Sequence, residues 1–368
     1  MVMVKAKRDD LLNPLSAVSG IIERRHTLPI LSNVLMERAG DGLSFLATDI
    51  EMQITARGNA GGSAETRSVT VGARKLVDIL RALPADAEVS LQMQDKRMQV
   101  KAGRSRFTLQ TLPAEDFPRL AKPGGDVARF SIPQRALRKQ LALVQYAMAQ
   151  QDIRYYLNGL LMVVDAKALK LVATDGHRLA YAAMKLDAEL PAQEVIVPRK
   201  TVTELGKLLA DSDDPVNVEI SATQAAFSFG SIELVSKLVD GKFPDYTRVI
   251  PTGHKNKLTL DRETLRQALS RAAILSNEKF RGVRWVLTQD SLRIVSSNTE
   301  QEEAVEELEV KYSGDGLDIG FNVTYLLDVL NNISASEVTA SFGDAASSAL
   351  VEFGAEVDFK YVVMPMRI

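Results

Sequence analysis

The amino-acid sequence predicts an α+β fold made of three repeated domains, each with two helices that cover one face of antiparallel sheets. Four short blocks recur three times, in the same order and at near-constant spacing. Clusters of proline and glycine separate the three copies. The length of 368 residues, with 46% hydrophobic and 25% charged residues, is sufficient for a buried core in each domain.

The first block of each copy is a short strand that runs into the start of a helix. It occupies residues 4–11, 130–137 and 258–265. The helices that follow are expected over residues 8–25, 133–148 and 261–275.

The second block is a strand that ends on a short polar residue. Apolar and polar residues alternate, as in a half-buried strand, over residues 43–49, 169–175 and 292–298. The strands end on Asp49, Asp175 and Asn298, and a turn that needs a short polar side chain explains all three. We therefore interpret Asp175 and the nearby His177 as parts of a turn, not as a catalytic pair.

The third block is a strand followed by an amphipathic helix, and these helices are expected over residues 73–83, 198–210 and 321–333. The fourth block aligns Leu112 and Phe117-Pro118 with Leu238 and Phe243-Pro244, and more loosely with Val362–Pro365. Each copy thus has the order strand, helix and several strands twice, which indicates two similar halves.

The clusters between the copies are Lys122–Gly125 and Pro251–His254. As linkers they place the domains at residues 1–125, 126–254 and 255–368. The stretch Gly58–Ser63 lies between two strand-like runs, so we interpret it as a flexible hairpin loop inside the first copy.

The charge is distributed unevenly. A net charge of −2 argues against a protein that coats nucleic acid by bulk attraction. The six expected helices nevertheless carry 15 Lys and Arg against 8 Asp and Glu, whereas the rest of the chain carries 30 against 39. Either the helices form a basic surface for the phosphates of a polyanion, or the charge of solvated helix faces is positive by chance.

The number of helices limits the size of a closed ring. Because neighbouring helices pack about 8–10 Å apart, a ring of six helices has a narrow hole, whereas a ring of twelve, from two chains, has room for duplex DNA.

Several classes of protein are excluded. The chain has no cysteine, which removes thiol nucleophiles and thiolate metal sites. It contains no phosphate-binding glycine loop, His-Glu-x-x-His or Gly-x-Ser-x-Gly motif. We therefore expect neither an enzyme nor a cofactor or metal site. No apolar run is long enough to span a membrane and Met1–Asp10 does not form a signal peptide, so we expect a cytoplasmic protein with no membrane association.

Five stretches carry a resemblance to a known family: Arg154–Gly159, Ala173–Leu179, Ser236–Tyr246, Ile274–Val283 and Tyr361–Arg367. Over its whole length the chain closely resembles the β subunits of bacterial DNA polymerase III, the sliding clamps. The resemblance implies the DNA-clamp fold and a head-to-tail homodimeric ring that encircles duplex DNA. Such a ring binds DNA independently of the DNA sequence and acts as a processivity factor for DNA polymerases. The implied partners are the DNA polymerase III core and other polymerases, the ATP-driven clamp loader complex, and repair and replication-regulating proteins with short clamp-binding peptides.

The resemblance also assigns roles to residues. It implies a peptide-binding cleft made by Leu157, Thr174, Gly176, His177, Arg178, Leu179, Pro244, Arg248, Val249, Asn322, Tyr325, Ser348, Val362, Met364, Pro365, Met366 and Arg367. It implies DNA contacts by Arg25, Arg74, Gln151, Tyr155, Tyr156 and Lys200. On one chain of the dimer, the implied interface comprises Lys75, Arg104, Arg106, Phe107 and Leu109. On the other chain it comprises Ile274, Leu275, Glu300, Glu302, Glu303 and Glu306.

Two departures from the family pattern are visible. Val305 interrupts the acidic run Glu300–Glu309, which puts one interface ion pair in question, and Ala345-Ala346 is small for a cleft rim. The apolar tail Met364–Met366 suggests docking into a groove, with plain core packing as the alternative. A ring-like adaptor that binds peptides but no nucleic acid is the alternative function.

Overall fold

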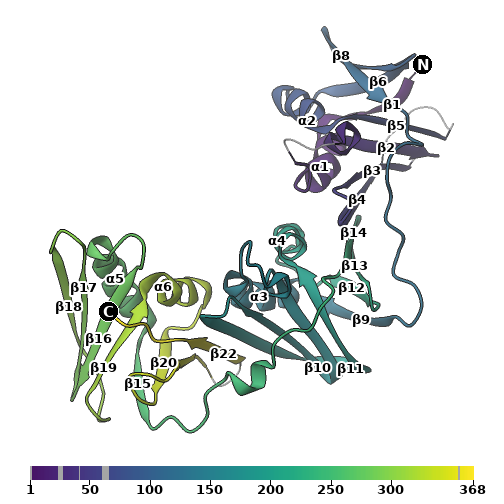
Figure 1. Ribbon diagram of the computed structural model, residues 1–368. Helices are drawn as coiled ribbons and strands as arrows, with labels where there is room; N and C mark the ends of the chain where they lie inside the picture. Colours follow the sequence, from purple (N-terminus) through teal and green to yellow (C-terminus); the bar gives the residue numbers. More distant parts are fainter. Residues whose placement is uncertain (1, 24–27, 41, 60–65, 355–356) are drawn as a thin grey trace. The chain divides into compact units, whose positions relative to one another are not determined.

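The computed structural model describes residues 2–23, 28–40, 42–59, 66–354 and 357–368 (Figure 1). Its internal contacts divide the chain into two compact units. The first comprises Met1–Ala136 and Thr203–Leu238, and the second comprises Leu137–Val202 and Val239–Ile368. The domain boundaries near residues 125 and 254 stay predictions. Residues 60–63 of the expected hairpin loop lie outside the described residues.

The described part of the first unit is built on one 12-stranded sheet, in the order β1-β6-β7-β8-β5-β2-β3-β4-β14-β13-β12-β9. Its strands are β1 (Val2–Lys7), β2 (Asn33–Ala39), β3 (Gly42–Thr48), β4 (Met52–Asn59), β5 (Arg67–Gly72), β6 (Glu88–Gln94), β7 (Arg97–Ala102), β8 (Ser105–Leu112), β9 (Ala128–Pro133), β12 (Pro215–Ile220), β13 (Gln224–Phe229) and β14 (Ile232–Lys237). The antiparallel pair β4–β14 joins the first and second copies of the repeat, with Ile54 opposite Leu234 and both buried.

The second unit holds a six-stranded sheet, in the order β10-β11-β22-β21-β20-β15, and a four-stranded sheet, in the order β18-β17-β16-β19, within the described residues. The first contains β10 (Gly159–Thr174), β11 (Arg178–Pro198), β15 (Asn256–Asp261), β20 (Glu337–Phe342), β21 (Ala349–Glu352) and β22 (Asp358–Val363). The second contains β16 (Gly282–Thr288), β17 (Ser291–Ser297), β18 (Glu303–Glu309) and β19 (Leu317–Asn322). The pair β11–β22 joins the second and third copies, with Leu179 opposite Val362.

Helices lie at all six expected places, and they are shorter than expected. They are α1 (Arg8–Ser19), α2 (Ala73–Ala82), α3 (Gln134–Val144), α4 (Arg199–Leu208), α5 (Arg262–Ala272) and α6 (Val323–Asn332). Short 3₁₀ turns are η1 (Pro29–Ser32), η2 (Gln145–Ala147), η3 (Tyr155–Leu157), η4 (Tyr246–Arg248) and η5 (Ala273–Leu275). The expectation that the first helix reaches residue 25 was wrong, because α1 ends before Gly20, a poor helix former where a side chain would meet the Glu204 carboxylate. No helix in the described ranges is long and apolar enough to cross a membrane.

The turn after the second-block strand has the same construction in all three copies. The side-chain oxygens of Asp49, Asp175 and Asn298 each accept two backbone N–H groups further along the turn, at 2.8–3.1 Å. Asp175 thereby binds the backbone N–H of His177 at 2.9 Å. The interpretation of these residues as turn-forming side chains is confirmed.

Candidate functional site

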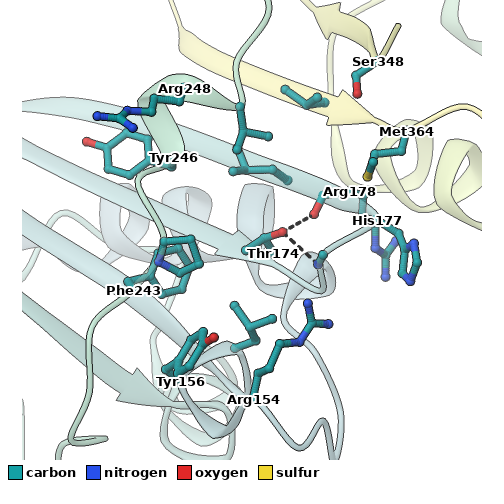
Figure 2. A pocket seen from close by; sticks show the side chains of 16 residues that line it. Arg154, Tyr156, Thr174, His177, Arg178, Phe243, Tyr246, Arg248, Ser348 and Met364 are labelled. Carbon is teal, nitrogen blue, oxygen red and sulfur yellow. Dashed lines mark hydrogen bonds between the residues drawn. The ribbon is translucent and has the colours of Figure 1, made fainter. Parts of the chain in front are cut away.

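A cavity of about 510 Å³ lies in the second unit, beside the turn that joins β10 to β11 (Figure 2). Apolar and aromatic side chains dominate its walls, as is usual for ligand sites. The lining residues are Arg154, Tyr156, Leu157, Thr174, Gly176, His177, Arg178, Leu179, Phe243, Pro244, Tyr246, Arg248, Val249, Ser348, Val362 and Met364. Segments that are far apart in the sequence therefore build one site.

The turn Thr174–Arg178 forms one wall of the cavity. The Thr174 hydroxyl donates to the carbonyl of Arg178 at 2.6 Å and accepts from the N–H of Gly176 at 3.1 Å, as the dashed lines in Figure 2 show. Gly176 has a φ of +89°, and a Cβ atom there would come within 2.9 Å of the Arg154 guanidinium. The backbone conformation therefore favours glycine, whereas the end of the Arg154 side chain could move aside for a larger residue.

Aromatic side chains form a second wall. Phe243 is 7% exposed and belongs to a buried cluster with Leu157. The ring of Tyr246 stacks on that of Tyr181, with the centroids 5.9 Å apart. Burial raises the pKa of both phenols, so both are neutral at physiological pH, and of the two Tyr246 lines the cavity.

The residues after β22 contribute a third wall. Met364 lines the cavity and donates its N–H to the carbonyl of His177 at 3.0 Å. Met366 donates its N–H to the carbonyl of Gly320 in β19 at 2.9 Å. A Cβ atom at Gly320 would lie 2.7 Å from Ile368, so the tail lies directly against this strand. The tail thus runs from the β10–β11 turn to the edge of the four-stranded sheet.

A buried charge lies at the wall of the cavity. The Arg178 side chain is 9% exposed and donates to the carboxylates of Asp175 at 3.0 Å and Asp328 at 2.6 Å. Burial alone would lower the pKa of this guanidinium, but Tyr361 and the two carboxylates outweigh burial, and the pKa is raised. Arg178 therefore stays a cation at the wall of the cavity.

The structure brings together most of the residues that the resemblance assigns to a cleft. Twelve of the 17 line this cavity: Leu157, Thr174, Gly176, His177, Arg178, Leu179, Pro244, Arg248, Val249, Ser348, Val362 and Met364. The five that do not line it are Asn322, Tyr325, Pro365, Met366 and Arg367. Tyr325 instead lines a neighbouring polar cavity of about 320 Å³, and Asn322 caps α6. Ala345 and Ala346, expected at the rim, are exposed and do not line the cavity.

Four lining residues were not assigned to the cleft from the sequence. Arg154, Phe243 and Tyr246 had no assigned role, and Tyr156 was assigned to DNA. A signal was present for Phe243, because it occupies the fourth-block position of Phe117, which is also buried. The aromatic wall could have been predicted from that repeat.

The cavity offers surfaces for binding an extended chain. Its apolar walls include a methionine, whose flexible side chain adapts to different ligands, and Ser348 adds a hydrogen-bonding group. The described ranges contain no group of three or more His, Cys, Asp or Glu side chains placed to hold a metal ion.

The residues expected to contact DNA lie in both units. They are Arg74 on α2, Gln151, Tyr155, Tyr156 and Lys200, whereas Arg25 lies outside the described residues. Arg74 and Arg81 line a groove of about 440 Å³ between α1 and α2. Tyr155 is 57% exposed and packs edge-on against Tyr156, with the ring centroids 5.8 Å apart. Exposed cations and rings of this kind can contact a phosphate backbone.

The residues expected at a dimer interface lie on the strands β8 and β18 and on segments outside these strands. In the first unit, Lys75 is on α2, and the strand β8 and the turn before it carry Arg104, Arg106, Phe107 and Leu109. In the second unit, η5 and the segment around β18 carry Ile274, Leu275, Glu300, Glu302, Glu303 and Glu306. Ile274 is 76% exposed, whereas Leu109 is only 9% exposed. Glu306 already pairs with Arg271 of its own chain at 2.7 Å, and that hydrogen bond lowers the pKa of Glu306.

Comparisons with known proteins agree with one another. Models of the DNA polymerase III beta subunit match the N-terminal domain at residues 2–121, the central domain at residues 131–245 and the C-terminal domain at residues 247–367. The beta sliding clamp of Pseudomonas aeruginosa is 49% identical over 365 residues, and that of Escherichia coli K12 is 47% identical over 362 residues. Each alignment covers 98% of this chain and 99% of the relative.

Solved structures give the same result. The DnaN sliding clamp of Pseudomonas aeruginosa bound to griselimycin has a TM-score of 0.96 at 47% identity, and Caulobacter crescentus pol III beta has a TM-score of 0.93 at 40% identity. Both comparisons cover 100% of this chain and 100% of the other. Because the sequence matches and the structural matches both extend over the chain, it belongs to the DNA polymerase III beta subunit family, the beta sliding clamps.

Proposed function

We propose that this chain is a DNA polymerase processivity factor, two copies of which close into a ring around duplex DNA and hold polymerases there through short peptides. Membership of the sliding-clamp family supports self-association and DNA and polymerases as general partners. The clamp loader, and repair and replication-regulating proteins with clamp-binding peptides, are the more specific partners that we propose.

The observation that carries the proposal is a strand junction that occurs twice inside the chain. Strand β4 of the first copy pairs with β14, the last strand of the second copy, and β11 pairs with β22, the last strand of the third. In the third copy the strand that corresponds to β4 and β11 is β18. In the first copy the strand that corresponds to β14 and β22 is β8. Among the described residues β18 pairs only with β17, and Ser105–Gln110 of β8 pairs only with β7. Joining β18 of one chain to β8 of the next would repeat the junction head to tail, and two such contacts close a dimer.

The internal junction also predicts the register of that contact. In the pair β4–β14, Thr55 lies opposite Glu233. Arg106 of β8 and Glu233 of β14 occupy equivalent positions, because each lies the same number of residues after the hairpin turn that precedes its strand. Val305 of β18 and Thr55 of β4 also occupy equivalent positions, because β18 pairs with β17 in the same register as β4 pairs with β3. Val305 is therefore expected opposite Arg106, which then reaches a carboxylate only at a diagonal position such as Glu303.

Direct contact with DNA is proposed to be weak and independent of sequence. The groove between α1 and α2 presents Arg74 and Arg81, which suit phosphate contacts. The chain as a whole is slightly acidic, with a net charge of −2, so these contacts depend on where the cations lie. Affinity of this kind falls steeply with added salt, and lasting retention on DNA must then come from the closed ring.

The cavity in the second unit is the proposed peptide site. Its volume of about 510 Å³ and its aliphatic and aromatic walls suit a peptide with a pair of large apolar side chains, and a glutamine is the polar residue expected beside them. The equivalent turn in the first copy starts at Asp49, which matches Asp175, and carries the charged Glu51 at the position of His177. One strong peptide site per chain, and two per ring, is therefore expected.

Retention on circular DNA tests the function. Protein loaded on a nicked circle should persist at a salt concentration that abolishes its direct binding to a short linear duplex, and cutting the circle should release it. Rapid loss from the uncut circle at that salt would refute the ring. Peptide binding by a protein that is never retained on the circle would favour the adaptor without DNA.

A further inference from the structure

The guanidinium of Arg178 links two copies of the repeat beside the cavity. Besides Asp175 and Asp328, it donates to the carbonyl of Tyr146 at 2.7 Å, and it lies 4.4 Å from the centroid of the Tyr325 ring. Asp175 and Tyr146 belong to the second copy, whereas Asp328 and Tyr325 lie on α6 of the third. Asp328 is therefore the one carboxylate in this set that ties Arg178 to α6.

A buried guanidinium is held only if its donors find acceptors, because an unpaired donor in a poorly solvated place is costly. The Arg178 side chain is 9% exposed, and its hydrogen bond to Asp328, at 2.6 Å, is the shortest of the three that the guanidinium donates. Asp328 itself is 33% exposed and does not line the cavity. Asp328 can therefore affect a bound peptide only through Arg178.

We infer that Asp328 is a positioning residue of the peptide cleft, because it holds Arg178 and with it the Thr174–Leu179 wall against α6. This inference rests on the proposed peptide-binding function. The wall needs such a tie because it also meets the tail: the carbonyl of His177 accepts the N–H of Met364. A cleft held in its binding shape does not have to be ordered when the peptide arrives, which favours affinity.

Without Asp328, Arg178 keeps Asp175 and the Tyr146 carbonyl but loses its charged partner on α6. The Asp328→Ala variant should bind peptide about tenfold more weakly, which corresponds to about 1.4 kcal/mol. Asp328→Asn keeps an oxygen that can accept from Arg178 and should stay within about threefold of the wild type. The matched control is Asp318→Ala, which removes a carboxylate of the same copy that binds Arg284 at 2.7 Å on an exposed surface.

The assay is fluorescence anisotropy of a labelled peptide with one glutamine and two adjacent large apolar residues, titrated with the full-length dimer. Melting temperature and sedimentation report whether each variant folds and dimerises. The same Asp328→Ala change in an Arg178→Met background tests the route, because there it should cost no further affinity. Asp328→Asn keeps the inference testable even if Asp328→Ala folds poorly.

The outcomes separate this inference from the proposed function. Weaker binding by Asp328→Ala, recovery in Asp328→Asn and no added loss in the Arg178→Met background support the positioning role. Wild-type affinity in Asp328→Ala, or an equal loss with Arg178 absent, overturns it while peptide binding by the wild type stands. If the wild type and Asp318→Ala bind no such peptide, the proposed peptide site fails and the inference fails with it.

Discussion

The contact between the tail and β19 predicts how one methyl group affects the cleft. In Gly320→Ala the new Cβ atom would lie 2.7 Å from the Ile368 side chain and closer still to the carbonyl of Met366. Contacts this short cannot persist, so the tail must move away from β19. Gly320 stays paired with Arg284 in the sheet, and the domain itself should therefore stay folded.

The size of the effect follows from what the tail loses. Displacement breaks the hydrogen bond from Met366 N–H to the Gly320 carbonyl, at 2.9 Å, and such a bond contributes about 1 kcal/mol net. Met364, which precedes Met366 by two residues, lines the cavity. If that energy is no longer available to hold the wall, peptide affinity should fall about fivefold.

Peptide anisotropy and hydrogen exchange of the tail check this prediction together. Gly316→Ala is the matched control, because its nearest neighbour would be the carbonyl of Leu287 at an ordinary 3.9 Å, and it should bind like the wild type. Faster exchange at Met366 in Gly320→Ala with unchanged peptide affinity would refute the reasoning, since the tail would then move without affecting the cleft.

Three further predictions follow from the other sites. Replacing Ile274 and Leu275 with alanine should yield monomers by sedimentation at low micromolar concentration, because rim ion pairs contribute only about 0–1 kcal/mol each, and a surviving dimer would contradict the interface. Deleting Met364–Ile368 leaves β22 complete, so it should abolish peptide binding by anisotropy without dissociating the dimer; unchanged affinity would mean that the cleft is misplaced. The side-chain hydrogen bond from Arg154 lowers the pKa of Asp152 from 3.8 to about 2. This contact should therefore stabilise the loop that contains both residues above pH 3.8, and the stabilisation should be lost as the pH falls through about 2. In Arg154→Met the NMR-titrated pKa should rise toward 3.8, and a value still near 2 would exclude the guanidinium as the cause.

The repeat made much of the fold predictable. The α+β class, the order of helices and strands in each copy, and the turns at Asp49, Asp175 and Asn298 all follow from patterns that lie close together in the chain. The ends of the helices were less predictable. Residues 145–147 and 273–275 form 3₁₀ turns where helix was expected, because the last turn of a helix often tightens and its bonding depends on neighbouring packing.

The cleft was predictable only through the family resemblance, and only in part. Twelve residues that the resemblance assigned do line the cavity, but Tyr246 and Arg154 gave no signal of their own. Tyr156 was assigned to DNA, yet its ring lies at the cavity wall beside the exposed ring of Tyr155. Which of two adjacent tyrosines faces a cavity depends on the conformation of the short turn η3, which composition and spacing do not determine.

By itself the sequence determined the threefold repeat, the elements within each copy and the turn residues, because hydrophobic period and turn chemistry act over a few neighbouring positions. Only the tertiary structure decided which elements of different copies meet. Arg178 and Asp328 are 150 residues apart, and their contact exists because β11 pairs with β22 and brings α6 of the third copy beside a turn of the second. The contact of Met366 with Gly320 lies within the third copy, and it too joins segments that are far apart in the chain. Such contacts depend on strand register and side-chain packing between segments that the chain itself places far apart, and no local pattern records them.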